Sequence, residues 1–173
     1  MNLLMAIVLF TGLDLYFLKD SPDLLIRVFP EIQTEQITIY YSFSGANWHS
    51  IETRKVGKFF DAIITPAEGL DIVGFYFIYD KGEIDDNDDK LYLYEVKKSP
   101  RMIMPISFSD LEIILSQARG KIDSNEHIDE AIQLLDYVGN TLIFIPIIKD
   151  GPSELKKNEL QTEVENLRKQ IGE

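Results

Sequence analysis

The chain has 173 residues, of which 17 are Lys or Arg and 29 are Asp or Glu, so its formal net charge at pH 7 is −12. This length suits one domain with a sizeable core, and the acid excess argues against a protein that coats nucleic acid by itself, because such binding rests on phosphate neutralisation. Cysteine is absent, which excludes disulfides, a cysteine nucleophile and thiolate metal sites.

The N-terminal segment contains an apolar run from Leu3 to Phe10. It is too short to span a bilayer, and no basic residue precedes it as in a secretory signal, so we expect a buried strand or short helix. A cytoplasmic location without membrane contact is the corresponding expectation.

The first half of the chain predicts two helices and one strand. Ser21 and Pro22 are typical of a helix start, and Pro30 would end that helix. Residues 36–43 are β-branched and aromatic, which predicts a strand. Residues 49–63 place apolar side chains at helical spacing, which predicts a second helix.

The second half predicts strands over residues 71–79 and 90–96, joined by a long acidic tip, and then helices over 107–122 and 125–138. The apolar run 141–149 predicts a buried strand. Residues 151–173 predict an amphipathic C-terminal helix, since an apolar seam recurs there at Leu160, Val164, Leu167 and Ile171. The resulting fold class is α/β, with residues 1–150 as one domain whose core covers about 49–149.

The strongest candidate site lies at the end of the strand LYLYEV. Side chains alternate along a strand, so Glu95 and Lys97 project from the same face as Leu91 and Leu93. Burying a charged side chain without a partner costs free energy, so a strand normally keeps its buried face apolar. The charged residues at the end of this face are explained if Glu95 binds a cation and Lys97 faces an anionic substrate.

Asp71 begins the preceding strand and is expected to lie close to Glu95 across the hairpin. Two neighbouring carboxylates repel each other unless a divalent ion lies between them. Because only two histidines and no cysteines are present, oxygen ligands would have to hold that ion, which favours Mg²⁺, Mn²⁺ or Ca²⁺.

GLDIVGFYF followed by LYLYEVKKS resembles the restriction-endonuclease-like PD-(D/E)xK nuclease superfamily. The resemblance implies a mixed central sheet flanked by helices, with Asp71, Glu95 and the Val96 carbonyl holding Mg²⁺ or Mn²⁺ and Lys97 as the active-site lysine. It also implies a Glu in the preceding helix, for which Glu52 or alternatively Glu68 is the candidate, and Gln117 in the following helix. The segment is similar, more weakly, to nuclease subunits of antiphage systems such as Hachiman.

That resemblance implies metal-dependent hydrolysis of phosphodiester bonds, with DNA as the substrate. Because the chain is acidic, we expect a protein partner such as a helicase to deliver the DNA, and the C-terminal helix to contribute a protein contact.

Two other interpretations of the same residues stay open. Glu95 and Lys97 can form an ordinary salt-bridged pair at a sheet edge. The chain can also be a catalytically silent acidic binding module, such as an immunity, inhibitor or regulatory protein, whose acidity suits a basic partner.

Overall fold

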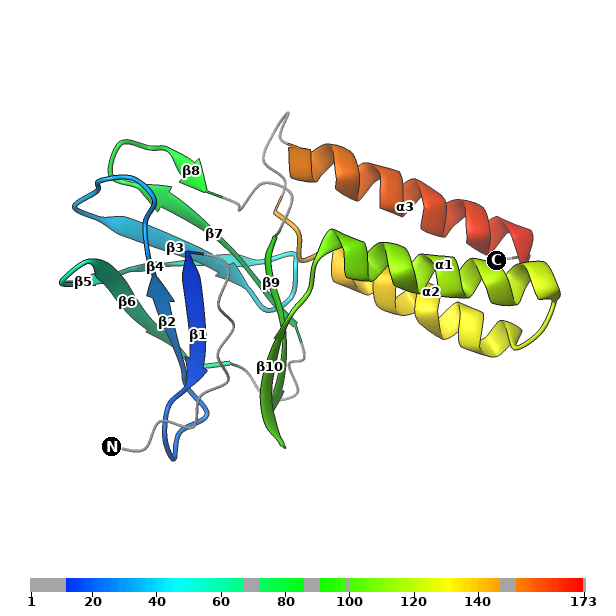
Figure 1. Ribbon diagram of the computed structural model, residues 1–173, viewed down its shortest axis with the longest axis horizontal. Helices are drawn as coiled ribbons and strands as arrows, with labels where there is room; N and C mark the ends of the chain where they lie inside the picture. The colour runs from blue at the N-terminus through cyan, green and yellow to red at the C-terminus, as the bar shows by residue number, and fades with distance from the viewer. Residues whose placement is uncertain (1–11, 67–71, 86–90, 99, 147–151, 173) are drawn as a thin grey trace.

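A computed structural model of the chain describes residues 12–66, 72–85, 91–98, 100–146 and 152–172. Within these ranges, strands occupy the first part of the chain and helices the last part (Figure 1). None of the described helices has the length and apolar character needed to cross a membrane.

The first sheet is antiparallel, with the strand order β1-β2-β6-β5. Its strands alternate between buried and partly exposed residues, as Leu24, Ile26 and Val28 do in β2, so one face is apolar. The bounds are β1 (Leu13–Phe17), β2 (Leu24–Val28), β5 (Arg54–Val56) and β6 (Phe59–Ile64).

The second sheet is also antiparallel and has the order β10-β9-β7-β3-β4, with the short β8 paired to one end of β7. Its β-branched and aromatic residues favour extended backbone. The bounds are β3 (Ile37–Ser42), β4 (Trp48–Glu52), β7 (Ile72–Tyr79), β8 (Ile84–Asp85), β9 (Tyr92–Lys98) and β10 (Arg101–Pro105).

The inner faces of the two sheets share one hydrophobic core, which contains Ile26 and Phe60 from the first sheet and Ile39, Phe75 and Tyr94 from the second. The architecture is therefore a β-sandwich. Its strand order is that of an immunoglobulin-like sandwich, because β1, β2, β6 and β5 take the places of strands A, B, E and D, while β3, β7 and β9 take those of C, F and G.

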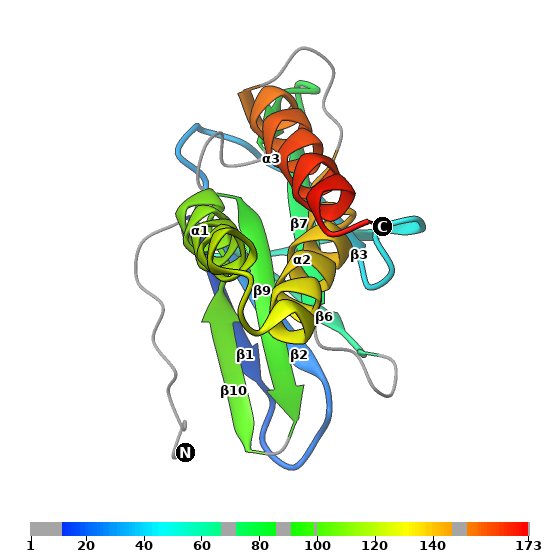
Figure 2. The same cartoon turned by 90° about the vertical axis from the view of Figure 1, so that its right-hand side faces the viewer.

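Three helices follow the sandwich and project from one side of it as a helical arm (Figures 1 and 2). They are α1 (Phe108–Ser124), α2 (Ile128–Leu142) and α3 (Pro152–Gln170). A capping box starts α1, since Ser107 accepts a hydrogen bond from the Asp110 N–H and the Asp110 carboxylate accepts one from the Ser107 N–H. The arm has its own apolar core, built around Leu111, Leu135 and Leu167.

The arm joins the outer face of the second sheet. Leu91 and Leu93 belong to the apolar core of the arm rather than to the sandwich core. A Cβ built on Gly74 of β7 would lie 2.4 Å from the carbonyl oxygen of Phe144, which follows α2. Glycine is therefore required at this position because backbone approaches backbone there.

The α/β class and the C-terminal helix predicted from the sequence are confirmed, as are the helices at 107–122 and 125–138 and the strands at 36–43, 71–79 and 90–96, with shifted ends. Three predicted elements are wrong. The helix predicted from Ser21 to Phe29 is strand β2, and the helix predicted over 49–63 is β4, β5 and β6. The strand predicted over 141–149 is the end of α2 and a turn up to Pro146, and 147–149 lie outside the described residues, as does the Leu3–Phe10 run.

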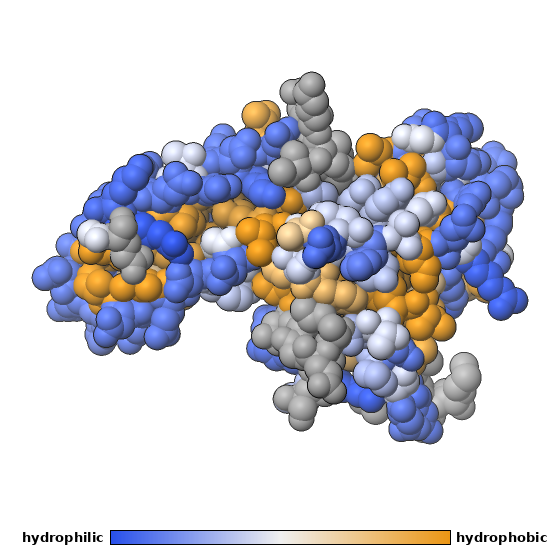
Figure 3. All heavy atoms as spheres, turned by 180° about the vertical axis from the view of Figure 1, so that it is seen from behind, coloured by the Kyte–Doolittle hydropathy of each residue, from blue (hydrophilic) through white to orange (hydrophobic). Residues whose placement is uncertain are grey.

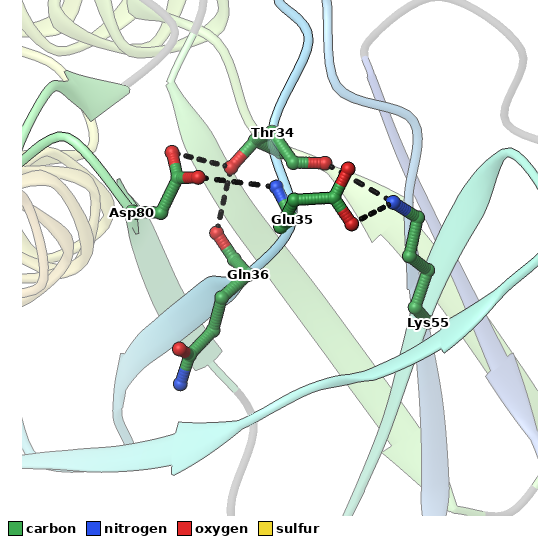
Figure 4. Close-up of polar contacts among 5 residues, drawn as sticks. All are labelled: Thr34, Glu35, Gln36, Lys55 and Asp80. Atoms are coloured by element: carbon green, nitrogen blue, oxygen red, sulfur yellow. Dashed lines mark hydrogen bonds and ion pairs between the residues drawn. The ribbon is translucent and has the colours of Figure 1, made fainter.

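A polar network ties the loop before β3 to two other parts of the sandwich (Figure 4). The hydroxyl of buried Thr34 lies 2.8 Å from the carbonyl oxygen of Gln36 and 2.9 Å from Oδ1 of Asp80. The Glu35 N–H donates to Oδ2 of Asp80 at 3.2 Å, and Lys55 Nζ contacts the Glu35 carboxylate at 2.6 Å. The network joins the β2–β3 loop to β5 and to the end of β7.

This network makes stability depend on pH through Asp80. The hydrogen bonds from Glu35 and Thr34 lower the pKa of the Asp80 carboxyl below its ordinary value. A carboxyl group whose pKa is lower in the folded state stabilises the fold fully when the pH is above its unfolded-state pKa. This stabilisation is lost as the pH falls through its folded-state pKa. Asp80→Asn should therefore lower the melting temperature at pH 7. The difference in melting temperature between this variant and the wild type should become smaller below about pH 4. Thermal melts across pH test this, and an equal effect at pH 7 and pH 2 would contradict it.

Candidate functional site

Strand β9 carries the charged pair that the sequence singles out. Ladder pairing places Glu95 opposite Ile72 of β7 and Met104 of β10, and Lys97 opposite Met102. Tyr94 and Val96 point into the sandwich core, so Glu95 and Lys97 project from the outer face, on the side of the arm. The prediction that both side chains share one face is confirmed.

The two side chains form an ion pair, with Lys97 Nζ 2.9 Å from Glu95 Oε1. The Glu95 side chain is 19% exposed and that of Lys97 is 44% exposed, so the carboxylate is the more enclosed partner. Tyr137 of α2 is half-buried nearby, and burial, followed by the Glu95 charge, raises the pKa of its hydroxyl. The carboxylate therefore lies at the base of the arm and is neutralised by a lysine on its own strand.

The remaining predicted metal ligands are only partly described. Asp71 lies outside the described residues, as does Glu68, the alternative to Glu52. Val96 is described, and its side chain is in the core, opposite Ile103. Among the described residues, no three His, Cys, Asp or Glu side chains gather as a metal group would require. Of the predicted metal ligands Asp71, Glu95 and Val96, Glu95 supplies the one described carboxylate, so the described residues do not by themselves make an oxygen-ligand site.

Glu52 and Gln117 lie away from the pair. Glu52 is an exposed residue of β4, not of a helix, and β4 is three strands from β9. At the usual spacing that is about 14 Å. Gln117 is exposed on α1, nine residues after Phe108, and lines an open hollow of about 440 Å³ beside the α1–α2 turn. The predicted grouping of these two residues with Glu95 is not found.

Sequence reasoning missed an aromatic surface, formed by Tyr40, Trp48 and Tyr76. Tyr40 and Tyr76 are ladder partners whose rings stack at 4.7 Å and 9°, and the Trp48 ring lies 5.1 Å from that of Tyr76. Their neighbours Ile39, Phe75 and Phe77 are in the core, so these rings lie on the outer face of the second sheet. The alternation of Tyr40 with Ile39 was the available signal.

The aromatic surface lies on the part of the outer face next to β4, where all three side chains are partly exposed. Seen from behind, hydrophobic atoms are visible on the sandwich, where the arm meets it, and in a patch near the far end of the arm that is surrounded by hydrophilic atoms (Figure 3). Glu52 is the exposed charge beside this surface on β4.

Ion pairs leave acids as the main unneutralised charge of the arm. Four of its bases bind acids, in the pairs Arg119–Glu163, Lys121–Glu130, Lys156–Glu112 and Arg168–Asp136. Exposed Asp123, Glu126 and Asp129, around the α1–α2 turn, have no ion pair within the described part of the chain, and neither has Lys169. The excess of acid in the sequence is thus presented at the surface.

Comparison of the sequence with models of known protein families and with curated proteins finds no match.

Proposed function

We propose that this chain is a non-catalytic acidic binding module that recognises a basic segment of another polypeptide. The aromatic surface carries the proposal. Tyr and Trp are the residues that most often dominate binding energy at protein interfaces, because they bury large rigid areas and keep a polar group. Tyr40, Trp48 and Tyr76 offer such side chains on one sheet face, already in contact with one another.

The net charge of the chain indicates that its partner is positively charged. A net charge of −12 steers basic ligands toward the molecule and repels acidic ones. Glu52 lies beside the aromatic surface, and the bases of the arm are largely occupied by its own acids. Complementary charge contributes mainly to specificity and association rate, and apolar contacts supply affinity.

The experiment is a selection from a random peptide display library on the immobilised chain. We expect the enriched peptides to carry net positive charge and to lose at least ten-fold in affinity when Trp48→Ala replaces the wild type. Phe29→Ala is the matched control, because Phe29 is 41% exposed and follows a strand of the other sheet. Absence of any enriched peptide, enrichment of acidic peptides, or equal loss in both variants would overturn the proposal.

Metal-dependent hydrolysis of a phosphodiester is the second candidate, favoured by Glu95 and Lys97 sharing one face at the end of β9. It requires Asp71 to complete the ligand set, so the paired residues alone do not carry it. A PD-(D/E)xK active site would use the ammonium of Lys97 toward the scissile phosphate.

If this second candidate is right, Mg²⁺ or Mn²⁺ should support cleavage of DNA in the presence of the natural partner, and chelation should stop it. Lys97→Met should abolish cleavage, whereas Lys55→Met, which removes another lysine paired with a glutamate, should not. Calorimetric titration of Mg²⁺ into wild type and Glu95→Gln gives an independent measurement. Normal cleavage by Lys97→Met would exclude this candidate.

A further inference from the structure

Apart from the two-residue β8, the two sheets end in four edge strands within the described residues, and three of these edges are protected. β1 and β10 lie against each other, where the Arg101 guanidinium donates to the Leu18 carbonyl at 3.0 Å and lies over the Phe17 ring. β5 has three residues, and two of them, Arg54 and Lys55, are exposed bases. Short strands, charges and mutual covering are the usual means by which sheets avoid pairing with other chains.

β4 is less protected in the part of the chain that the structure describes: it has five residues, and its charged residue is Glu52, an acid that would repel an acidic strand but not a basic one. Its sequence, WHSIE, has no proline, lysine or arginine, and it is the last strand of its sheet. A strand with this exposure presents unpaired backbone N–H and C=O groups. Such a row of groups is a template for one more strand.

The backbone groups that face outward can be identified from the ladder. The Thr53 N–H donates to the Ile37 carbonyl at 3.1 Å, next to the paired residues Thr38 and Glu52. In an antiparallel ladder, hydrogen-bonded positions alternate, so His49 and Ile51 turn their backbone groups toward β3. The N–H and C=O groups of Trp48, Ser50 and Glu52 therefore point away from the sheet.

We propose that β4 accepts an extended, basic segment of a partner polypeptide as an additional antiparallel strand. The inference rests on the proposed function and names the mode of binding. Side chains of the added strand on the outer face would meet Trp48 and Glu52, which favours an apolar or cationic residue opposite the first and a Lys or Arg opposite the second. On the other face they would meet the partly buried Ile51.

The charges near β4 support a partner of this chemistry. Arg54, the nearest Lys or Arg along the chain, belongs to β5 of the other sheet, where it pairs with Asp61 in the ladder. A second copy of the chain is a poorer occupant, because each copy carries a net charge of −12 and brings another Glu52 to the edge.

The probes are three octapeptides: alternating Lys-Val, its fully N-methylated form, and alternating Glu-Val. The N-methylated peptide keeps the charge but has no backbone N–H to donate. We expect the Lys-Val peptide to bind at least ten-fold more tightly than either of the others. On binding, hydrogen exchange at the amides of Trp48, Ser50 and Glu52 should slow, with little change at Ile39 and Phe75 in the interior of the sheet.

Two variants of one residue test the edge itself. Ser50→Pro removes an outward N–H and is tolerated at a sheet edge, whereas Ser50→Thr keeps that N–H. We expect Ser50→Pro to lose binding at least ten-fold with little change in melting temperature, and Ser50→Thr to bind as wild type. Ile51→Pro, which removes an N–H turned toward β3, should lower the melting temperature sharply and so verifies the register.

The outcomes separate this inference from the function on which it rests. Equal binding of the Lys-Val peptide and its N-methylated form, or wild-type binding by Ser50→Pro, overturns strand addition and leaves a basic ligand in place. Failure of every basic peptide overturns both. Self-association that Ser50→Pro abolishes would overturn the choice of partner in favour of a second copy.

Discussion

Gly74→Ala is expected to destabilise the protein by roughly 1–3 kcal/mol, the usual range for overpacking a tight contact. The added Cβ would lie 2.4 Å from the Phe144 carbonyl oxygen and 3.5 Å from Leu93 Cδ1. The first contact is with backbone, which cannot turn away as a flexible side chain can. The arm or the sheet must shift, and the contact between them is weakened.

Gly120→Ala is the matched control for this substitution. Gly120 lies inside α1, and a Cβ there would meet nothing within 4 Å. Alanine is preferred to glycine in a helix by about 1 kcal/mol, so this variant should be slightly more stable than wild type. Urea unfolding of both variants measures the difference. A Gly74→Ala protein as stable as wild type would show that the arm does not approach β7 as closely as described.

The second large effect is expected in α3. Leu160, Val164 and Leu167 are each at most 5% exposed and belong to the apolar core of the arm. The predicted seam therefore packs within this chain. Leu167→Ala should cost roughly 2–5 kcal/mol, because it removes a buried side chain and leaves a cavity.

Leu155→Ala is the control on the same helix, since the Leu155 side chain is 65% exposed. Its effect should stay within about 0.5 kcal/mol. Leu167→Ala should also increase binding of a dye that senses exposed apolar surface, if α3 separates from α1 and α2. Equal stability of the two leucine variants would contradict the packing of α3 on the arm.

The elements that the sequence predicts correctly are those with a strong local signal. α1 has a capping box at Ser107, and α3 repeats its apolar residues at helical spacing. β3 and β7 are rich in β-branched and aromatic residues, which favour extended backbone irrespective of neighbours.

The error over residues 49–63 has an identifiable physical cause. Apolar residues there also fit a helical spacing, but Val56 and Phe59 pair across a two-residue turn of Gly57 and Lys58. Gly57 has φ +66°, a conformation that glycine adopts readily and that closes tight hairpins. A Gly-Lys turn between two β-rich runs was thus the stronger signal, and the periodicity was coincidental.

The candidate site shows the same division between local and long-range information. The shared face of Glu95 and Lys97 follows from the alternation of one strand and could be predicted. Stacking of Tyr40 on Tyr76 depends on the pairing of β3 with β7, which are far apart in the sequence. The distance of Glu52 from Glu95 likewise depends on sheet order, which the sequence pattern alone does not specify.

The contact of Arg101 with Leu18 joins residues 83 positions apart and closes the β1 and β10 edges of the sandwich. Closing such a long loop costs chain entropy before the contacts between its ends contribute stability, so pairings between distant strands form slowly. During synthesis, this edge cannot close until β10 has emerged from the ribosome, whereas α1 and α2 are neighbours and can pair as soon as both exist. The nascent sandwich is therefore the part of the chain most exposed to mispairing, and its β1 edge stays open to other strands until β10 has emerged.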